Sequence, residues 1–348
     1  MRCIPASTAL ALAPLLAACA AGPGTFINRP LEPIGWPDAE QPRISVEFAY
    51  HGSDDADRDP GFFTGVKRVI FGLEPVMLRS PYGLTTSADG STLLVADAAQ
   101  GAVHLIDLET CEHRVVREGP DGPLRSPIGV AALPDGRFCV SDSTAGRVYV
   151  FADDGSPQTA LGSSSELGRP TGMAWDPYRS RLLVVDTVGG RVVALDPDDG
   201  RVLAESGRPG EDAGDFNRPT NLVVSPDGRV FVTDSMNFRV QVLDPELRPM
   251  SAFGIAGDGP GAFSKPKGIA LDSAGHVYVV DAMFDNVQVF DQQGQLLIAF
   301  AANGGGLGRL LLPSGIHIDA QDRIWVADSG NARVQVFRYH PLPPATLP

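Results

Sequence analysis

The sequence is poor in lysine, and acidic residues outnumber basic ones. Lysine occurs three times in 348 residues, at positions 67, 265 and 267. Lysine and arginine together number 28 against 42 aspartates and glutamates, which gives a formal net charge of −14. A net-acidic chain repels phosphate backbones unless it carries a local basic patch, and the arginines are scattered along the sequence. We therefore expect no nucleic-acid partner.

Long apolar runs are also lacking. The stretch from Ala9 to Ala18, interrupted by Pro14, is too short for a membrane span, which needs about 20 apolar residues. With Arg2 before it, it fits a signal peptide. The "LAAC" at 16–19 resembles a bacterial lipobox, which implies that residues 1–18 are removed and that Cys19 carries lipid. Ala20 then favours the outer membrane, facing the periplasm. An ordinary secretory signal is the alternative.

Cysteines are few, and after such processing only Cys111 and Cys139 keep free side chains. Two cysteines in an oxidising compartment could pair. However, Cys111 falls near the outer edge of one repeat unit and Cys139 inside the next. We therefore expect two unpaired thiols.

Glycine and proline, in contrast, are abundant and fall at intervals, which is typical of many tight turns. A single pattern recurs six times. Its copies are "LLVADAAQGAVHLID", "FCVSDSTAGRVYVFA", "LLVVDTVGGRVVALD", "VFVTDSMNFRVQVLD", "VYVVDAMFDNVQVFD" and "IWVADSGNARVQVFR". The shared aspartates are Asp97, Asp142, Asp186, Asp234, Asp281 and Asp328.

Each copy follows a short proline motif, in which a proline and a variable residue precede an apolar strand, as in "PYGLTT" and "PKGIAL". A turn, the Asp-bearing hairpin and a weaker fourth strand come next. Such a unit of about 45 residues is a four-stranded antiparallel meander, the blade of a β-propeller. The sequence therefore predicts an all-β, six-bladed β-propeller.

The chain ends indicate how the ring closes. The last copy has three strands, and residues 43–50, "RISVEFAY", form a lone strand that can complete it. We expect the propeller to occupy residues 43–340, with an inserted loop or lid at 51–80. Residues 19–42 are proline-rich and are predicted to be a tether, and 341–348 a flexible tail.

The copies "VFVTDSMNFRVQVLD" and "IWVADSGNARVQVFR", with the linker "GDGPGAFSKP" at 257–266, resemble NHL repeats in sequence and spacing. The resemblance covers about residues 43–340. In its whole plan the chain is similar to bacterial six-bladed NHL-type propeller lipoproteins. Blades 1 and 5 depart from the pattern, with Ala102 and Asn286 where the other blades have arginine.

The repeated Asp and Arg are predicted to be structural. An aspartate at the end of a strand accepts hydrogen bonds from turn N–H groups, and an arginine opening the next strand can face it. A catalytic device is needed once, whereas this one is built six times. The arginines are Arg147, Arg191, Arg239 and Arg333.

Positions that vary between blades are the candidates for binding. The variable residues of the proline motifs are Tyr82, Ile128, Thr171, Thr220, Lys267 and Ser314, which we expect to ring the channel mouth. Asn221 replaces the motif glycine of blade 4, either because it tolerates a left-handed backbone or to place an amide near the channel. Lys265 and Lys267 give this face a positive spot that could attract a carboxylate or sugar acid, unless they are merely solvated.

The turns that follow the shared aspartates of blades 4 and 5 carry unusually large apolar side chains. They are Met236, Phe238, Met283 and Phe284. Together they would form either an exposed patch for a protein partner or a surface covered by the 51–80 segment.

Signs of an enzyme are sparse. Related propellers include metal-dependent lactonases and zinc amidating lyases, but no proline motif here places a histidine directly after its proline. His317, on the sixth inner strand, is either an interior residue or a ligand. The aspartates of 54–61 lack the glycine and glutamate of a calcium loop, and no GxSxG motif occurs.

The sequence therefore predicts a lipid-anchored envelope propeller that binds a protein or a small ligand at its channel mouth, without a catalytic set or cofactor. The alternative is a propeller hydrolase or lyase with a calcium or zinc ion in the channel. A sensor head without an output domain is a third possibility. The oligomeric state stays open.

Overall fold

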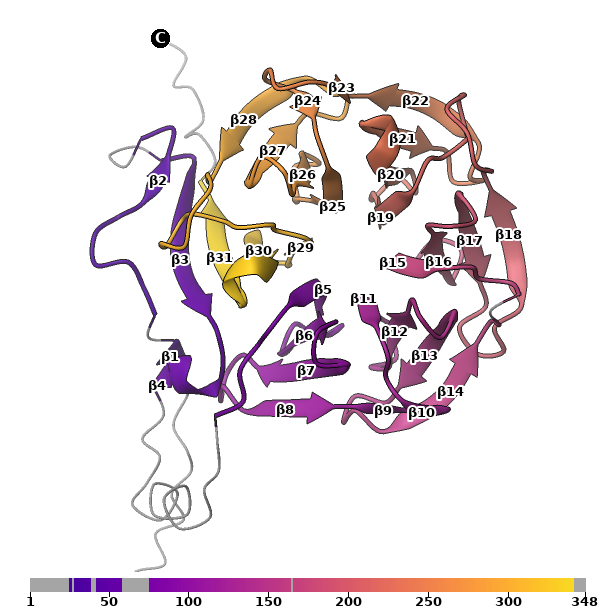
Figure 1. Cartoon of the computed structure of the whole chain (residues 1–348), viewed down its shortest axis with the longest axis horizontal. Helices are drawn as coiled ribbons and strands as arrows, with labels where there is room; N and C mark the ends of the chain where they lie inside the picture. The colour runs from indigo at the N-terminus through magenta and orange to yellow at the C-terminus, as the bar shows by residue number, and fades with distance from the viewer. Residues whose placement is uncertain (1–24, 27, 39–41, 58–74, 164, 341–348) are drawn as a thin grey trace, which may run out of the picture.

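The computed structural model describes residues 25–26, 28–38, 42–57, 75–163 and 165–340. The predicted signal peptide, Cys19 and tail lie outside these residues. Figure 1 shows six antiparallel sheets arranged around a central axis, as predicted. Among the described residues no helix is long and apolar enough to cross a bilayer.

The first three blades each contain four consecutive strands, ordered from the axis outwards. Blade 1 comprises β5 (Pro81–Thr86), β6 (Thr92–Asp97), β7 (Ala102–Asp107) and β8 (His113–Val116). Blade 2 comprises β11 (Pro127–Ala132), β12 (Phe138–Asp142), β13 (Arg147–Phe151) and β14 (Pro157–Leu161). Blade 3 comprises β15 (Pro170–Asp176), β16 (Arg181–Asp186), β17 (Arg191–Leu195) and β18 (Val202–Ser206).

The last three blades follow the same plan. Blade 4 comprises β19 (Pro219–Val224), β20 (Val230–Asp234), β21 (Arg239–Leu243) and β22 (Pro249–Phe253). Blade 5 comprises β25 (Pro266–Leu271), β26 (Val277–Asp281), β27 (Asn286–Phe290) and β28 (Leu296–Phe300). Blade 6 contains β29 (Ile316–Ile318), β30 (Arg323–Asp328) and β31 (Arg333–Tyr339).

The predicted closing strand is present as β3 (Ile44–Tyr50), which pairs antiparallel with β31 and completes blade 6. The ring is thus closed without a covalent bond, and its first and last blades leave no open edge between them. One further strand, β2 (Gly35–Trp36), pairs with β3 and makes this sheet five-stranded.

The prediction of a tether at 19–42 is therefore wrong for part of this segment. Trp36 lies 5.7 Å from the Phe300 ring and 6.0 Å from the Phe337 ring, between centroids. Because packing an indole against two aromatic rings is favourable, the segment packs on blades 5 and 6, to which Phe300 and Phe337 belong. Nearer the N-terminus, β1 (Thr25–Phe26) pairs with β4 (Ala56–Asp57).

The connections between the strands contain short elements. Two two-stranded pairs occur in the linkers: β9 (Glu118–Gly119) with β10 (Gly122–Pro123), and β23 (Ile255–Ala256) with β24 (Ala262–Phe263). The 3-10 turns are η1 (Ser53–Asp55), η2 (Ser235–Asn237) and η3 (Ser329–Asn331).

The core consists of apolar side chains packed between neighbouring blades. Middle strands such as β16 are buried along their whole length, because both faces of each blade are covered. Cys111 lies in the cluster between blades 6 and 1, and Cys139 lies in the cluster between blades 2 and 3. No disulfide joins the two, as expected.

Glycines of the proline motifs let the inner strands meet near the axis. A Cβ on Gly129 would lie 2.2 Å from the Thr171 oxygen, and one on Gly315 would lie 2.1 Å from the Tyr82 oxygen. Neither glycine has a positive φ, so close approach rather than backbone freedom requires them.

Candidate functional site

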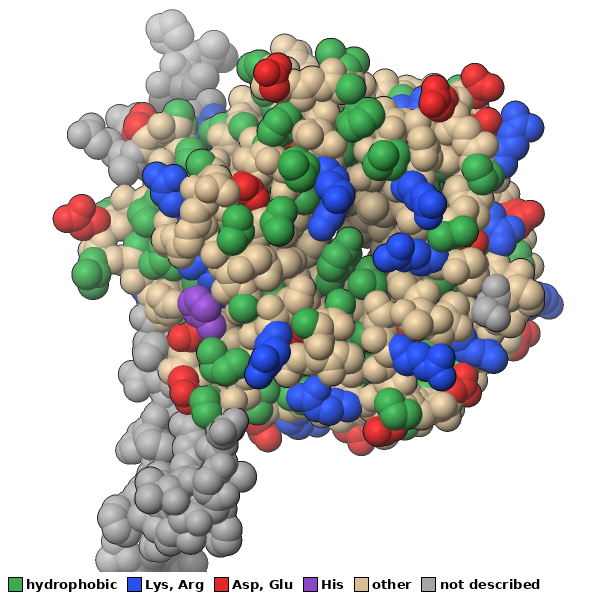
Figure 2. All heavy atoms as spheres, in the orientation of Figure 1, with side chains coloured by type: hydrophobic (Ala, Val, Ile, Leu, Met, Phe, Trp, Pro, Cys, Tyr) green, Lys and Arg blue, Asp and Glu red, His purple; other side chains and the backbone are tan. Residues whose placement is uncertain are grey.

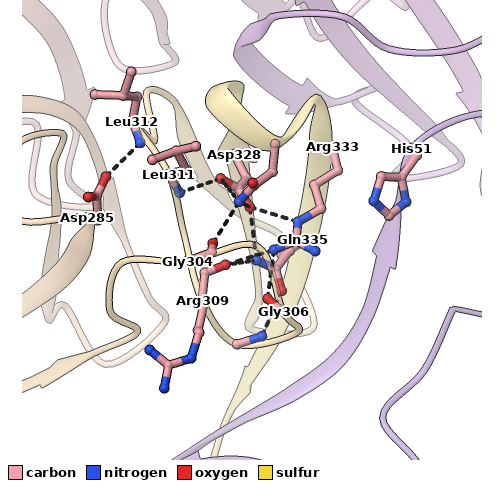
Figure 3. Close-up of polar contacts among 12 residues, drawn as sticks. His51, Asp285, Gly304, Gly306, Arg309, Leu311, Leu312, Asp328, Arg333 and Gln335 are labelled. Atoms are coloured by element: carbon pink, nitrogen blue, oxygen red, sulfur yellow. Dashed lines mark hydrogen bonds and ion pairs between the residues drawn. The ribbon is translucent and has the colours of Figure 1, made fainter.

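The blade aspartates hold the segments that lead into the inner strands. In blade 6, Asp328 is fully buried and accepts hydrogen bonds from the Leu311 backbone N–H (2.8 Å) and from Arg333 Nε (2.7 Å) (Figure 3). The amides of Asn331 and Gln335 donate to the same carboxylate. Arg333 also donates to the Gly306 and Arg309 carbonyls of that segment. The predicted structural role is therefore supported by these contacts.

Blades 1 and 5 lack this arginine, and the surroundings of their aspartates differ. In blade 1, His104 Nε2 lies 3.6 Å from the Asp97 carboxylate, and Gln100 Nε2 donates to it at 2.9 Å. Burial opposes ionisation of Asp97, but hydrogen bonds from His104 and the Arg79 N–H outweigh it and hold its pKa below the usual range. In blade 5, Asn286 Oδ1 is the one buried side-chain oxygen or nitrogen among the described residues that lacks a partner.

The inner strands enclose a central channel with a volume of about 470 Å³. Its walls are largely apolar, with Leu84, Val130 and Ile269 among the lining residues. Tyr82, Thr220 and Asn221 line the end where the inner strands begin, while Asp272, Asp319 and Asp322 line the opposite end. The two openings therefore differ in chemistry.

Two faces follow from this topology. We call the side where inner strands begin the mouth face; it also carries the turns between second and third strands. The side that carries the other turns is the reverse face. Exposed acidic residues crowd the reverse-face turns, among them Asp89, Asp135, Asp154, Asp198, Asp227 and Glu246.

Tyr82 and Lys267 meet at the mouth face although they come from blades 1 and 5. Lys267 Nζ lies 5.1 Å from the centroid of the Tyr82 ring, a cation–π contact that crosses blade 6. Burial, with the nearby charge of Lys265, lowers the pKa of Lys267 to about 8. Burial raises the pKa of Tyr82, and the positive charge of Arg169 opposes that rise. Tyr82 is thus in contact with one cation, Lys267 of blade 5, and in the field of a second, Arg169 of blade 3.

Asn221 lines the channel with its backbone extended, so the prediction that it exploits a left-handed backbone is wrong. Its Oδ1 accepts from the Leu222 N–H at 2.9 Å. The neighbouring Gly172 leaves room for it, since a Cβ there would lie 2.3 Å from Oδ1. The placement agrees with the alternative of an amide near the channel.

His317 lines the channel, and its Nε2 lies 3.0 Å from the Thr86 hydroxyl of blade 1. Burial lowers the pKa of His317 to about 4, although Asp319 opposes this shift. The imidazole is therefore neutral at ordinary pH. A group of three or more His, Cys, Asp or Glu side chains able to hold a metal is not found in the described part of the chain. The acidic run at 54–61 lies partly outside that part.

Two predicted mouth residues lie elsewhere. Thr171 is 6% exposed and its hydroxyl pairs with that of Thr187, while Ser314 is 1% exposed and bonds the Ser329 hydroxyl and the Tyr82 carbonyl. The Ser314 hydroxyl joins blade 6 to blade 1, whereas the Thr171 hydroxyl bonds within blade 3 to Thr187, which in turn donates to the Pro219 carbonyl of blade 4. Neither hydroxyl is among the groups that line the channel. Short hydroxyl side chains suit this role because they reach the adjacent backbone without filling the channel.

The four apolar turn residues divide into two kinds. Met236 and Met283 are exposed at 50% and 57%. Phe284 is half-buried, and Phe238 packs against the core cluster that includes Phe263. Of the four, the two methionines are thus the exposed ones. The proposed cover lies largely at 58–74, outside the described residues.

A ring of cations was missed by sequence reasoning. Five of the six inner strands are preceded by a basic residue one or two positions before the proline of the motif: Arg79, Arg125, Arg169, Arg218 and Lys265. All five are exposed, and Figure 2 shows Lys and Arg side chains around the central opening. Alignment of the residues just before each proline would have revealed them.

The comparisons with known proteins agree with this fold. The NHL repeat model matches residues 124–151, 216–243 and 310–337. A stretch of 186 residues is 27% identical to NHL repeat-containing protein 2 of Bos taurus and 25% identical to that of Homo sapiens. The match covers 50% of this chain but only 22% of those relatives.

Solved structures of similar fold include a streptogramin B lyase, with a TM-score of 0.58 and 13% identity over 76% of this chain and 95% of that one. An auxiliary nutrient binding protein from Bacteroides thetaiotaomicron has a TM-score of 0.60 and 13% identity over 76% and 70%. At such identities the likeness shows the fold alone. The chain is thus a six-bladed β-propeller, three segments of which match the NHL repeat.

Proposed function

We propose that the chain is an exported, lipid-anchored propeller that binds a protein partner or a small envelope ligand through its mouth face. The observation that carries this proposal is the convergence of non-repeated polar side chains at one channel opening. Lys267 contacts the ring of Tyr82 there, and Asn221 lines the channel wall nearby. A face built only to close the ring would not need a different side chain from each blade.

The lipid anchor rests on the "LAAC" stretch and Cys19. We expect the full-length chain to fractionate with outer membranes, facing the periplasm, and to release from them when Cys19→Ser blocks acylation. Recovery of the unchanged chain in the soluble periplasm would contradict an anchor at this cysteine.

Site-specific photo-crosslinking tests the binding face. A crosslinking amino acid at Met283 on the mouth face should capture the partner or ligand in cells. The same amino acid at Tyr178, a 57% exposed residue on a reverse-face turn, serves as the control. Adducts from Tyr178 and none from Met283 would contradict the proposal.

A second candidate is a lyase or hydrolase acting in the channel, with calcium or zinc as the metal. It is favoured by His317 in the channel wall and by the lyases among structures of similar fold. Stoichiometric metal in the purified chain, or turnover of a substrate that is lost in His317→Ala, would support it over the binding proposal.

A further inference from the structure

The mouth-face cations differ from the other basic residues in their partners. Elsewhere in the described chain each arginine side chain forms a hydrogen bond or ion pair, as Arg191 does with Glu205 and Arg147 with Asp121. Six basic side chains form neither kind of contact within the described residues: Arg79, Arg125, Arg169, Arg218, Lys265 and Lys267. We call these six the ring of mouth-face cations. All six lie in the proline motifs or just before them. The protein has a net charge of −14, so a set of cations without counter-ions at one opening distinguishes that opening from the rest of the molecule.

The blade aspartates position these cations directly. Asp142 accepts from the backbone N–H of Arg125 at 2.6 Å, and Asp186 from that of Arg169 at 2.9 Å. Asp97 and Asp281 do the same for Arg79 and Lys265. Each carboxylate binds the backbone and leaves the cationic head free, so the repeat that builds the blade also presents a charge at the mouth.

Arg218 adds an independent observation. Its φ is +54°, a left-handed conformation that costs an arginine energy and that glycine adopts freely. Packing does not explain arginine here, because the side chain is exposed. An exposed arginine thus occupies a strained position, as the uncharged Leu312 does at the matching position of blade 6.

The linkers before the proline motifs also carry acidic residues, at earlier positions than the cations. Asp121 pairs with Arg147 and Glu166 accepts from Ser163, whereas Glu211, Asp212 and Asp258 are exposed. Arginine dominates the ring, and its planar guanidinium suits oxyanions such as phosphate and carboxylate.

We propose that the ring of mouth-face cations binds a small, multiply charged oxyanion, bearing phosphate or carboxylate groups, over the channel mouth. This rests on the proposed function, since it names the ligand class of that face. Single-stranded nucleic acid is disfavoured because such binders supply several stacking aromatic rings, and Tyr82 is the one aromatic residue among the described residues that line the mouth.

Titration calorimetry of the full-length chain in a neutral detergent tests the proposal, with tripolyphosphate and citrate as probes. We expect one of them to bind at one site per chain and to bind more weakly at 300 mM than at 50 mM NaCl. The mouth-face variant Arg169→Ala with Arg218→Gly and Lys265→Ala should weaken binding at least tenfold. The control variant Arg114→Ala with Arg201→Ala and Arg248→Ala removes the same charge from the reverse face and should change it less than twofold.

Equal losses in the two variants, or no binding of either probe, would overturn the proposal. Binding only to vesicles containing phosphatidylglycerol would assign the ring to a lipid surface, and binding only to an oligonucleotide would assign it to nucleic acid; both outcomes reject a small anion. Circular dichroism shows whether each variant is folded. If the anion fails to bind but the Met283 crosslink persists, the mouth-face function stands and only the ligand class is wrong.

Discussion

The ammonium group of Lys267 lies over the ring of Tyr82, and the two residues belong to blades that are separated by blade 6. This contact brings a partly buried positive charge to the channel mouth. Burial disfavours that charge, which is why the pKa of Lys267 falls to about 8. We interpret the lowered pKa as a loss of folding stability that is tolerated because the charge attracts anions to this site.

Removal of this lysine should therefore stabilise the fold near neutral pH. Between pH 8 and 10.5 the unfolded chain binds more protons at this site than the folded chain, so the free energy of unfolding rises with pH across that window. The cost of the charge is fully present at pH 7. We expect Lys267→Met to melt at a higher temperature than the unchanged protein at pH 7, and the gap to close above pH 10.5. A lower melting temperature at pH 7 would contradict this interpretation.

His317 should contribute to acid sensitivity. Its pKa is about 4 in the folded chain against 6.5 for the free side chain, so the unfolded chain takes up a proton first as the pH falls. Stability is lost between pH 6.5 and 4. His317→Gln, which can still bond the Thr86 hydroxyl, should lose less melting temperature between pH 7 and pH 4.5. Identical pH profiles would show that His317 is not held neutral.

Arg333 should be essential to blade 6. Its side chain and that of Asp328 are 4% and 0% exposed, so Arg333→Met leaves a buried carboxylate without its counter-ion. Loss of one partner of a buried pair costs about 3 to 5 kcal/mol. Thermal unfolding should shift down by roughly 10 °C. Arg201→Ala, which breaks a pair with an exposed arginine, is the control and should shift it little.

Blade 5 offers the opposite test. Asn286 leaves a buried oxygen without a partner, where blades 2, 3, 4 and 6 place an arginine. Asn286→Arg should remove the unsatisfied atom and pair with Asp281, which we expect to stabilise the protein by about 1 kcal/mol. Denaturant unfolding measures this directly. The matched change Ala102→Arg should not stabilise, because His104 already contacts Asp97.

The fold was predictable because its signals repeat. Six aspartates at one period, the proline motifs and the lone strand at 43–50 identified the blades and their closure. The packing of Trp36 could not be predicted, because it depends on rings from distant parts of the chain.

The site was harder to predict from the sequence. Thr171 and Ser314 were expected at the mouth, but whether a short hydroxyl faces the channel or the next blade depends on three-dimensional packing. Arg79 and Arg169 are 90 positions apart and become members of one ring only when the blades close. Lys265 was singled out, but its four arginine counterparts were not.

Hydrogen–deuterium exchange of the full-length chain, with and without saturating tripolyphosphate, tests the central claim most directly. We predict slower exchange in the mouth-face segments near residues 79–82, 125–128, 168–171, 217–221 and 264–268, with the reverse-face turns unchanged. Slower exchange confined to the reverse-face turns, or no change in the mouth-face segments at saturation, would contradict the claim that this face is the binding site.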